Sequence, residues 1–426
     1  MTSIPRSRTH ISMPDTDAVI DEVSPRFGPV RASRWTVLVA FAVLVACTQL
    51  LWLTFAAVTD QTSAALHVSN GVVGDLAVVN PLLFVVLAIP AGRWLDRNFG
   101  AALAAGAVLT AVGSLLRVAD TSSFAWLLAG QLVVSAGQPL VLNASTKVAA
   151  RYFPEGERTA AISVASAAQF VGILLAALTS GPLVSAGGLR LLLTVQAAVT
   201  VAAAVTMLAA LRLPAAFPVE APAHESLGWL RHDRLMWKLA ALLFIGVGVF
   251  NAIATWLDSI LTKFGHGSLS GPLIGLTTVA GIAGAAVLPG IVTKRDKRRG
   301  MLVAATVATA VVFAVLSLAH APVIFGVLLA VEGFVLLACL PVALEWSEVH
   351  VGPARAGTAT GALLLAGNLG GVLLVLLVQA VIGNPYAALL VMSVTALPGI
   401  AIALRLPDVT RAPATASEPA MNGPAA

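Results

Sequence analysis

Charged and aromatic residues are scarce in this sequence. Only 11% of its 426 residues are charged and 6% are aromatic, whereas a soluble domain usually carries about 25% charged residues. Hydrophobic residues make up 58% of the chain, and the mean hydropathy is +0.93. Because so few charges are unusual for a soluble fold of this size, the composition predicts a protein that is embedded in a lipid bilayer.

Cysteine is nearly absent, and the motifs of catalysis are missing. The two cysteines, Cys47 and Cys339, both fall inside apolar segments, so we expect buried thiols and neither a disulfide nor a metal site.

The first 34 residues contain no apolar run, and we therefore expect no cleavable signal peptide. The sequence has no nucleotide-binding loop, metal-ligand cluster or catalytic triad, so it predicts neither an enzyme nor a cofactor.

Long apolar runs fill most of the chain. A hydrocarbon core about 30 Å thick requires roughly 20 helical residues. Runs of about this length lie at 35–58, 72–91, 101–118, 124–147, 159–181, 189–211, 238–261, 271–292, 300–319, 322–346, 357–382 and 386–405. The sequence thus predicts an all-α membrane protein with twelve transmembrane helices. Its predicted parts are a disordered tail (1–34), a six-helix bundle (35–211), a central loop (212–237), a second six-helix bundle (238–405) and a disordered tail (406–426).

Basic residues are concentrated in every second loop. If the N-terminus lies inside, 22 of the 25 Lys and Arg residues fall in cytoplasmic segments, and only Arg117, Arg190 and Lys263 lie outside. Because cytoplasmic loops of membrane proteins carry an excess of Lys and Arg, this pattern predicts a multi-pass protein of the cell (inner) membrane with both tails in the cytoplasm. The pI of about 9.7 is then a signal of topology, and no nucleic-acid partner is expected.

The two halves of the chain resemble each other at an offset of about 198 residues. IPAGRWLDRNFG at 89–100 corresponds to LPGIVTKRDKRRG at 288–300, and Gly92 aligns with Gly290. Repeated six-helix halves are typical of secondary transporters, in which the substrate binds near the midplane between the halves. The repeat therefore predicts two pseudo-symmetric bundles around a central site.

The motif between the second and third spans carries a resemblance. Gly92, Asp96, Arg97 and Gly100 in GRWLDRNFG resemble the loop 2–3 signature of the major facilitator superfamily. The resemblance implies the twelve-helix fold of that superfamily and transport by alternating access. In such a motif the glycine permits close helix contact, and Asp96 and Arg97 would form a charged latch at a helix end, where a carboxylate interacts with the helix dipole. The alternative is a solvated turn with an incidental Asp-Arg pair.

A closer resemblance extends over most of spans one to eleven. The stretches LLAGQLVVSAGQP (127–139), FNAIATWLDSIL (250–261), LIGLTTVAGIAG (273–284) and LPVALEWSEVHVGPARAGTATG (340–361) are similar to the feline leukaemia virus subgroup C receptor-related branch of the superfamily. Eukaryotic members of that branch are associated with the transport of choline, ethanolamine and haem. The resemblance therefore implies a small amine or quaternary ammonium substrate. Haem is disfavoured, because no histidine or tyrosine is well placed within the spans to ligate iron.

The repeat brings candidate substrate-binding residues into register. One aromatic residue, one carboxylate and one amide of each half correspond at this offset: Trp52 and Phe250, Asp60 and Asp258, and, to within one residue, Gln169 and Asn368. An aromatic face attracts an ammonium group by roughly 0.5–2 kcal/mol, and an amide can bind a hydroxyl or carbonyl group of the same ligand. The six side chains are therefore predicted to line one cavity that binds an organic cation.

Each of these residues also has a plainer interpretation. The aromatic side chains could pack between helices, the amides could form interhelical hydrogen bonds worth about 0.6 kcal/mol, and the aspartates, near the outer ends of their spans, could be solvated. In the resembled branch, Trp52 matches an aromatic residue of the ligand cage and Gln169 a ligand-contacting glutamine. At three positions this sequence differs from that branch: it has Phe250 in place of a tyrosine, Asn368 in place of a glutamine and Asp60 in place of an asparagine. The ligand contacts of that branch therefore do not transfer unchanged.

Span ten contains three glutamates, at positions Glu332, Glu345 and Glu348. A carboxylate at the bilayer centre costs at least about 2.5 kcal/mol, so it should face a cavity or a partner. Glu332 lies nearest the middle of the span and is a candidate proton site. Glu345 is expected to pair with Arg151, Arg158 or Arg355 as a cytoplasmic gate.

The sequence as a whole predicts a transporter. It would be a secondary-active or facilitative carrier that works by alternating access, acts as a monomer in the bilayer and binds a small organic cation. Protons or sodium could serve as the coupling ion. Two alternatives stay open: a drug or organic-anion efflux permease of the same fold, and a non-transporting membrane receptor. The spans carry almost no Arg or Lys away from their ends, which disfavours an anion, and the lack of a folded soluble domain disfavours a receptor.

Overall fold

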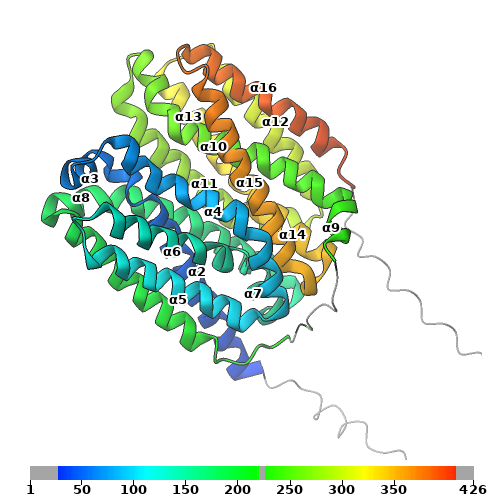
Figure 1. Ribbon diagram of the computed structural model, residues 1–426. Coiled ribbons are helices and arrows are strands. Elements are labelled where there is room, and N and C mark those ends of the chain that lie inside the picture. Colours follow the sequence, from blue (N-terminus) through cyan, green and yellow to red (C-terminus); the bar gives the residue numbers. More distant parts are fainter. Residues whose placement is uncertain (1–26, 218, 220–225, 409–426) are drawn as a thin grey trace, which may run out of the picture.

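The computed structural model describes residues 27–217, 219 and 226–408, and these residues form a bundle of helices (Figure 1). The first half consists of α2 (Phe27–Leu53), η1 (Ala56–Val58), α3 (Thr59–Leu66), α4 (Asn70–Arg97), α5 (Phe99–Ala119), α6 (Phe124–Leu142), α7 (Ser145–Tyr152) and α8 (Glu155–Ala210). The second half consists of α10 (Arg234–Lys263), η2 (Gly267–Leu269), α11 (Ser270–Lys294), α12 (Arg298–Leu316), α13 (Pro322–Leu336), α14 (Cys339–Val351), η3 (Pro353–Arg355), α15 (Ala356–Gln379) and α16 (Pro385–Leu404). The short α9 (Gly228–His232) precedes α10.

The longest helix, α8, accounts for two spans. Eleven helical segments of the described residues are long and apolar enough to cross a membrane. A straight helix with the 56 residues of α8 would be about 84 Å long, far more than a core about 30 Å thick. Gly187 (φ −163°, ψ 25°) and Gly188 (φ 69°, ψ −171°) interrupt it with non-helical backbone, so the second part forms a span of its own. The predicted twelve-helix fold is thereby confirmed.

Gly188 is the position where this interruption depends on glycine. Its φ of 69° with ψ of −171° is a conformation that other residues adopt only with strain, and such strain amounts to about 1–3 kcal/mol. We expect Gly188→Ala to lower the melting temperature of the purified protein by several degrees. Gly181→Ala is the matched control, since no atom lies within 4 Å of a Cβ at this helical position. Equal melting curves for the two variants would contradict the assignment.

The first span ends earlier than the sequence suggests. A helix was expected over 35–58, but α2 runs from Phe27 to Leu53. The Thr54 hydroxyl lies within hydrogen-bond distance of the carbonyls of Leu50 and Leu51 and of Gln196 Oε1, and Val58 is non-helical (φ −138°, ψ 41°). The chain then continues as η1 and α3. Trp52 consequently lies in the last turn of a membrane helix, beside the break.

The predicted tails fall mostly on residues outside the described part of the chain. Residues 1–26 and 409–426 of the tails and residues 218 and 220–225 of the central loop are not among those described. Residues 27–34, predicted to belong to the first tail, instead form the first two turns of α2.

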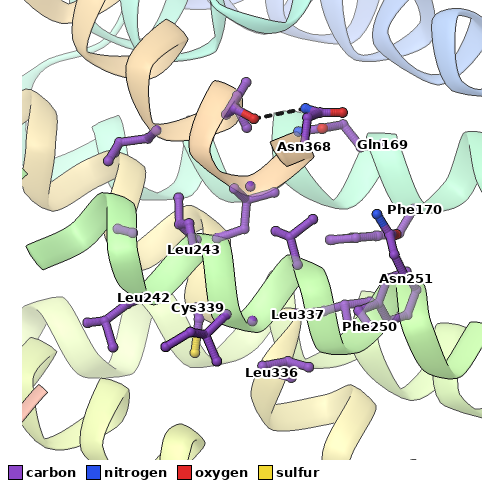
Figure 2. A pocket seen from close by; sticks show the side chains of 18 of the residues that line it. Gln169, Phe170, Leu242, Leu243, Phe250, Asn251, Leu336, Leu337, Cys339 and Asn368 are labelled. Atoms are coloured by element: carbon purple, nitrogen blue, oxygen red, sulfur yellow. Dashed lines mark hydrogen bonds between the residues drawn. The ribbon is translucent and has the colours of Figure 1, made fainter. Parts of the chain in front are cut away.

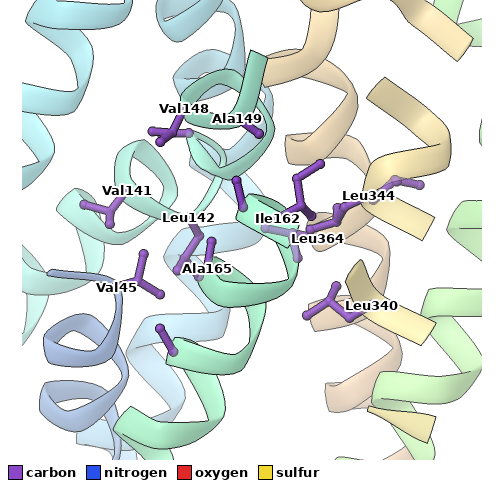
Figure 3. Close-up of a cluster of buried hydrophobic side chains, with 14 of the residues drawn as sticks. Val45, Val141, Leu142, Val148, Ala149, Ile162, Ala165, Leu340, Leu344 and Leu364 are labelled. Atoms are coloured by element: carbon purple, nitrogen blue, oxygen red, sulfur yellow. The ribbon is translucent and has the colours of Figure 1, made fainter. Parts of the chain in front are cut away.

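The hydrophobic core differs between the two ends of the bundle. We call the end that contains Lys147, Arg158 and Arg298 the basic end. Towards this end, one cluster of buried side chains extends through both halves, and Figure 3 shows Leu142 and Ile162 of the first half beside Leu340 and Leu364 of the second. Towards the opposite end, two separate clusters lie one in each half. The halves also pack against each other through α4 with α15 and α8 with α11.

Candidate functional site

Asp96 joins the two halves at the basic end. Its carboxylate accepts hydrogen bonds from the backbone N–H groups of Gly357 and Thr358, each at 2.9 Å, and from the Thr358 hydroxyl at 2.5 Å. Both residues lie in the first turn of α15, where unpaired N–H groups and the helix dipole favour an anion. The cation of this latch is Lys147, whose Nζ lies 3.0 Å from Asp96 Oδ1. The prediction that Arg97 supplies it is wrong, because Arg97 is exposed.

The two glycines of the loop motif have different surroundings. A Cβ on Gly92 would lie 2.6 Å from the carbonyl oxygen of Gly357 and 2.8 Å from Cα of Thr358. A Cβ on Gly100 would meet no atom within 4 Å. Only Gly92 is therefore needed for the contact of α4 with α15, as expected for close helix packing through small residues.

Glu345 forms an ion pair inside the second half. Arg298, at the start of α12, donates through Nε and Nη2 to the two carboxylate oxygens of Glu345 at 2.8 and 2.7 Å. The predicted pairing of Glu345 with Arg151, Arg158 or Arg355 is therefore wrong. Its side chain faces α12, and the bidentate geometry satisfies both oxygens.

Arg158 and Arg355 have other partners. Arg158 donates to Glu348 at 3.0 Å, and this pair joins α8 of the first half to α14 of the second. The guanidinium of Arg355 lies over the ring of Trp229, 5.2 Å from its centroid. The charged contact across the halves predicted for Arg158 is thus present, but its carboxylate is three residues further along span ten.

Hydrogen bonds join the two halves at the basic end. Eight hydrogen bonds between described residues cross from one half to the other at the basic end. Besides the contacts of Asp96 and Arg158, Lys147 donates to the carbonyls of Pro353 and Ala354, and the Thr146 hydroxyl lies 2.7 Å from that of Thr360. The basic end is therefore closed by direct contacts.

A cavity of about 120 Å³ lies between the halves. Side chains of α2, α6 and α8 line it from the first half, and side chains of α10 and α12 to α16 from the second. Towards the basic end it is bounded by Leu142, Leu340 and Leu364, which belong to the shared core cluster of Figure 3. A space of this size holds several water molecules or one small organic molecule.

Four of the six predicted substrate-binding residues line this cavity: Trp52, Gln169, Phe250 and Asn368. Trp52 donates its indole N–H to the carbonyl of Ala77 at 3.0 Å, which fixes the ring on α4. Figure 2 labels Gln169, Phe250 and Asn368 around the cavity. The repeat therefore placed one aromatic residue and one amide of each half in the same chamber.

The two amides differ in how their hydrogen-bonding groups are used. Asn368 donates from Nδ2 to the carbonyl of Leu364, one turn earlier in its own helix, at 2.8 Å. Gln169 is 7% exposed, and its Nε2 has no hydrogen-bond partner within the described structure. Since a buried donor without a partner is unfavourable, Gln169 is the amide most available to a ligand.

The two predicted aspartates lie outside the cavity. Asp60 is exposed in the first turn of α3 and accepts a hydrogen bond from Asn70 at 2.8 Å. Asp258 is exposed near the end of α10 and accepts one from Ser270 at 2.8 Å. Each carboxylate thus binds the first residue of a later helix, α4 or α11. Their correspondence in the repeat therefore reflects a turn that both halves share. The prediction that Asp60 and Asp258 line the substrate cavity is therefore wrong.

Several polar and aromatic residues of the cavity were not predicted: Gln49, Gln138, Phe170 and Asn251. The ring of Phe170, from the first half, packs edge-on against that of Phe250, from the second, with 6.2 Å between the centroids. Gln49 lies one turn before Trp52, and Phe170 and Asn251 are the neighbours of Gln169 and Phe250. For Gln49, Phe170 and Asn251, the signal was therefore their position next to residues already singled out. Among the described residues that line the cavity, none is Asp, Glu, His, Lys or Arg.

Glu332, the candidate proton site, is buried behind the cavity wall. It is 2% exposed, and its Oε1 lies 2.7 Å from the hydroxyl of Thr309. Thr309 itself lines the cavity. Glu332 is therefore separated from the chamber by one side chain.

Comparisons with known proteins agree with this architecture. The sequence matches the profile of the Major Facilitator Superfamily over residues 37–375. "Solute carrier family 49 member A3" of Danio rerio is 31% identical over 383 residues, which cover 84% of this chain and 80% of that protein. The human "Choline/ethanolamine transporter FLVCR2" is 24% identical over 389 residues, which cover 83% of this chain and 73% of that protein.

Solved structures show the same fold. The human organic anion transporter MFSD10 superposes with a TM-score of 0.72 at 17% identity, covering 88% of this chain and 99% of that one. The transporter FucP in its outward conformation gives a TM-score of 0.70 at 15% identity, covering 87% and 99%. At such identities the likeness concerns the fold alone. Proteins of this kind are transporters and generally not enzymes. The sequence profile, the relative at 31% identity and the two-bundle architecture together place this chain in the major facilitator superfamily.

Proposed function

We propose that the protein transports a small organic cation of the choline or ethanolamine class by alternating access. The observation that carries the proposal is the lining of the cavity between the halves. It combines three aromatic side chains, Trp52, Phe170 and Phe250, with five amides, Gln49, Gln138, Gln169, Asn251 and Asn368.

The chemistry of this lining fits an ammonium group better than an anion. Aromatic faces attract a cation by roughly 0.5–2 kcal/mol each, more where water is excluded, and a quaternary ammonium needs no hydrogen-bond acceptor. The amide of Gln169 can bind a hydroxyl on the same molecule. An organic anion would need a basic side chain, and the described lining residues include none. The relationship to the choline and ethanolamine transporter supports the same branch of the superfamily.

We further propose that the basic end faces the cytoplasm of a cell (inner) membrane, with both termini on that side. The excess of Lys and Arg in the loops of this end supports it. Contacts at this end and separate cores at the other would correspond to a state closed to the cytoplasm. Transport would then require the contacts of Asp96 and Arg158 to open while the opposite end closes, with the monomer as the working unit.

Replacement of Trp52 tests the substrate class. We expect Trp52→Ala to weaken choline binding by about tenfold, the loss of one strong cation–π contact, and Trp52→Phe to keep most of it. Binding is measured by thermal shift with choline and ethanolamine, and transport by uptake of radiolabelled choline into proteoliposomes. Trp126→Ala is the control, because Trp126 is 44% exposed on α6. Choline binding and uptake by Trp52→Ala at the wild-type level would contradict the proposed site.

A further inference from the structure

The cavity extends beyond the plane between the halves into the second half. Part of its wall belongs to helices of that half alone, namely Leu302, Ala305, Thr306 and Thr309 of α12, Leu336 of α13, Cys339 of α14 and Ala396 of α16. We call this part the C-terminal branch. In Figure 2, Leu336 and Cys339 of the branch lie on one side of α10, and Gln169 and Asn368 lie on the other.

Glu332 lies at the end of this branch. Its Oε1 is in contact with the Thr309 hydroxyl, and its Oε2 has no hydrogen-bond partner among the described residues. The Thr309 Oγ1 lies 2.7 Å from Glu332 Oε1 and 3.0 Å from the carbonyl oxygen of Ala305. One hydroxyl has a single proton to donate. Both contacts are full hydrogen bonds if Glu332 carries a proton that it donates to Thr309, which in turn donates to Ala305.

Within the described part of the chain, Glu332 has no charged partner that would hold it as a carboxylate. Two polar side chains interact with it, Thr309 of α12 through a hydrogen bond and the thiol of Cys339 at the start of α14. In the helices packed against α13, the remaining charged or titratable residues all lie towards the basic end: Lys294 of α11, Arg298 and Arg299 of α12, and Glu345, Glu348 and His350 of α14. Glu345 and Glu348 are already paired with Arg298 and Arg158. An unpaired buried carboxylate is strongly disfavoured in such a place.

We infer that Glu332 couples transport to protons by exchange, so that a proton and the organic cation occupy the protein alternately. The inference rests on the proposed function, because it requires a cationic substrate. When the cavity is empty, Glu332 holds the proton and the site is neutral. When a cation enters, its charge stabilises the carboxylate, and the proton leaves through the C-terminal branch into the cavity. The site is neutral again with cation and carboxylate together, so one proton is exchanged for one cation.

The test uses the full chain in proteoliposomes, with radiolabelled choline as the probe and the membrane potential held at zero by potassium and valinomycin. Counterflow of choline at equal pH reports transport itself. An acidic lumen should accelerate choline uptake by the wild type by about tenfold, within the usual range of coupling between sites, and uptake should make the lumen more alkaline. In Glu332→Gln we expect counterflow to persist and the acceleration to be lost. Asp258→Asn, which removes an exposed carboxylate outside the cavity, should keep both.

The outcomes separate this inference from the proposed function. Counterflow that ignores the pH gradient in the wild type, or acceleration that survives in Glu332→Gln, would overturn proton exchange and leave choline transport standing. Absence of counterflow in the wild type would refute choline as a substrate. In that case infrared spectroscopy of the empty protein decides whether Glu332 holds a proton. A protonated-carboxyl band at neutral pH that disappears in Glu332→Gln supports it, and its absence from the wild type refutes it.

Thr309→Val provides a second variant in case Glu332→Gln does not fold. It keeps the shape of the side chain and removes the hydroxyl that links Glu332 to the branch. We expect the pH at which choline uptake is half-maximal to shift. An unchanged pH profile would contradict the role of this contact.

Discussion

Asp96→Asn should open the basic end and slow transport at least about tenfold. The carboxylate of Asp96 binds the first turn of α15 and neutralises Lys147, whose side chain is 1% exposed. Removing one partner of a buried ion pair costs about 3–5 kcal/mol, and each 1.4 kcal/mol changes an equilibrium tenfold. The state closed at this end would therefore lose at least about a hundredfold in population relative to the open one. Transport depends on exchange between the two states, so it should slow at least about tenfold.

The opening can be measured as a distance between spin labels. Arg97 is exposed on the first half and Val349 is 38% exposed on the second, both at the basic end, so cysteines at these positions accept labels after Cys47 and Cys339 are replaced by alanine. We expect a longer and broader distance distribution in Asp96→Asn. Adding Lys147→Met to Asp96→Asn should restore part of the closed state, because it removes the unpaired buried charge.

Arg97→Ala is the control for the latch, measured by uptake because this position then carries no label. Arg97 belongs to the same loop motif but is exposed, and such substitutions usually change stability by less than about 0.5 kcal/mol. Uptake by Arg97→Ala should therefore match the wild type. Loss of uptake in Arg97→Ala together with normal uptake in Asp96→Asn would refute the assignment of Lys147 as the cation of the latch.

Most of the fold could be predicted because the bilayer imposes it. Every span must present about 20 apolar residues, and this requirement is visible in the sequence without knowledge of packing. The exceptions are places where a local interaction overrides hydropathy. The apolar run 35–58 predicts one helix through Val58, but the Thr54 hydroxyl and the non-helical backbone at Val58 end it at Leu53. In α8 the opposite occurs, since two spans follow each other with only Gly187 and Gly188 between them.

The site could be predicted only where position along the helix decides the outcome. Trp52 and Phe250 correspond in the repeat and both line the cavity. They do so because they lie at the same depth and on the same face of equivalent helices, α2 and α10. Asp60 and Asp258, eight residues later, correspond equally well. Each nevertheless lies beyond the cavity and binds the first residue of a later helix.

The partners of the ion pairs depend on the rotation of each helix, which a sequence pattern does not contain. Glu345 and Glu348 are three residues apart, or about 60° short of one full turn. One faces Arg298 of its own half and the other faces Arg158 of the opposite half. The prediction of a charged contact across the halves at Arg158 therefore named the right arginine and the wrong glutamate.

Gly92→Ala is the second substitution for which a large effect is expected. The added methyl carbon would lie 2.6 Å from the carbonyl oxygen of Gly357 and 2.8 Å from Cα of Thr358. Both are backbone atoms of α15, so no side chain can move aside and the helices must separate. Overpacking of this kind costs about 1–3 kcal/mol, which would reduce the population closed at the basic end by roughly 5–150-fold. The spin-label distance should lengthen and choline uptake should fall.

Gly100→Ala is the matched control, since it lies in the same loop motif and a Cβ there meets no atom within 4 Å. Its uptake and spin-label distance should equal those of the wild type. The separation caused by Gly92→Ala also withdraws the N–H groups of Gly357 and Thr358 from Asp96. Asp96→Asn should therefore have a smaller effect in the Gly92→Ala protein than in the wild type, because the two changes act on one contact. Effects that simply add would show that the glycine contact and the latch are independent, and the closed end would then need another explanation.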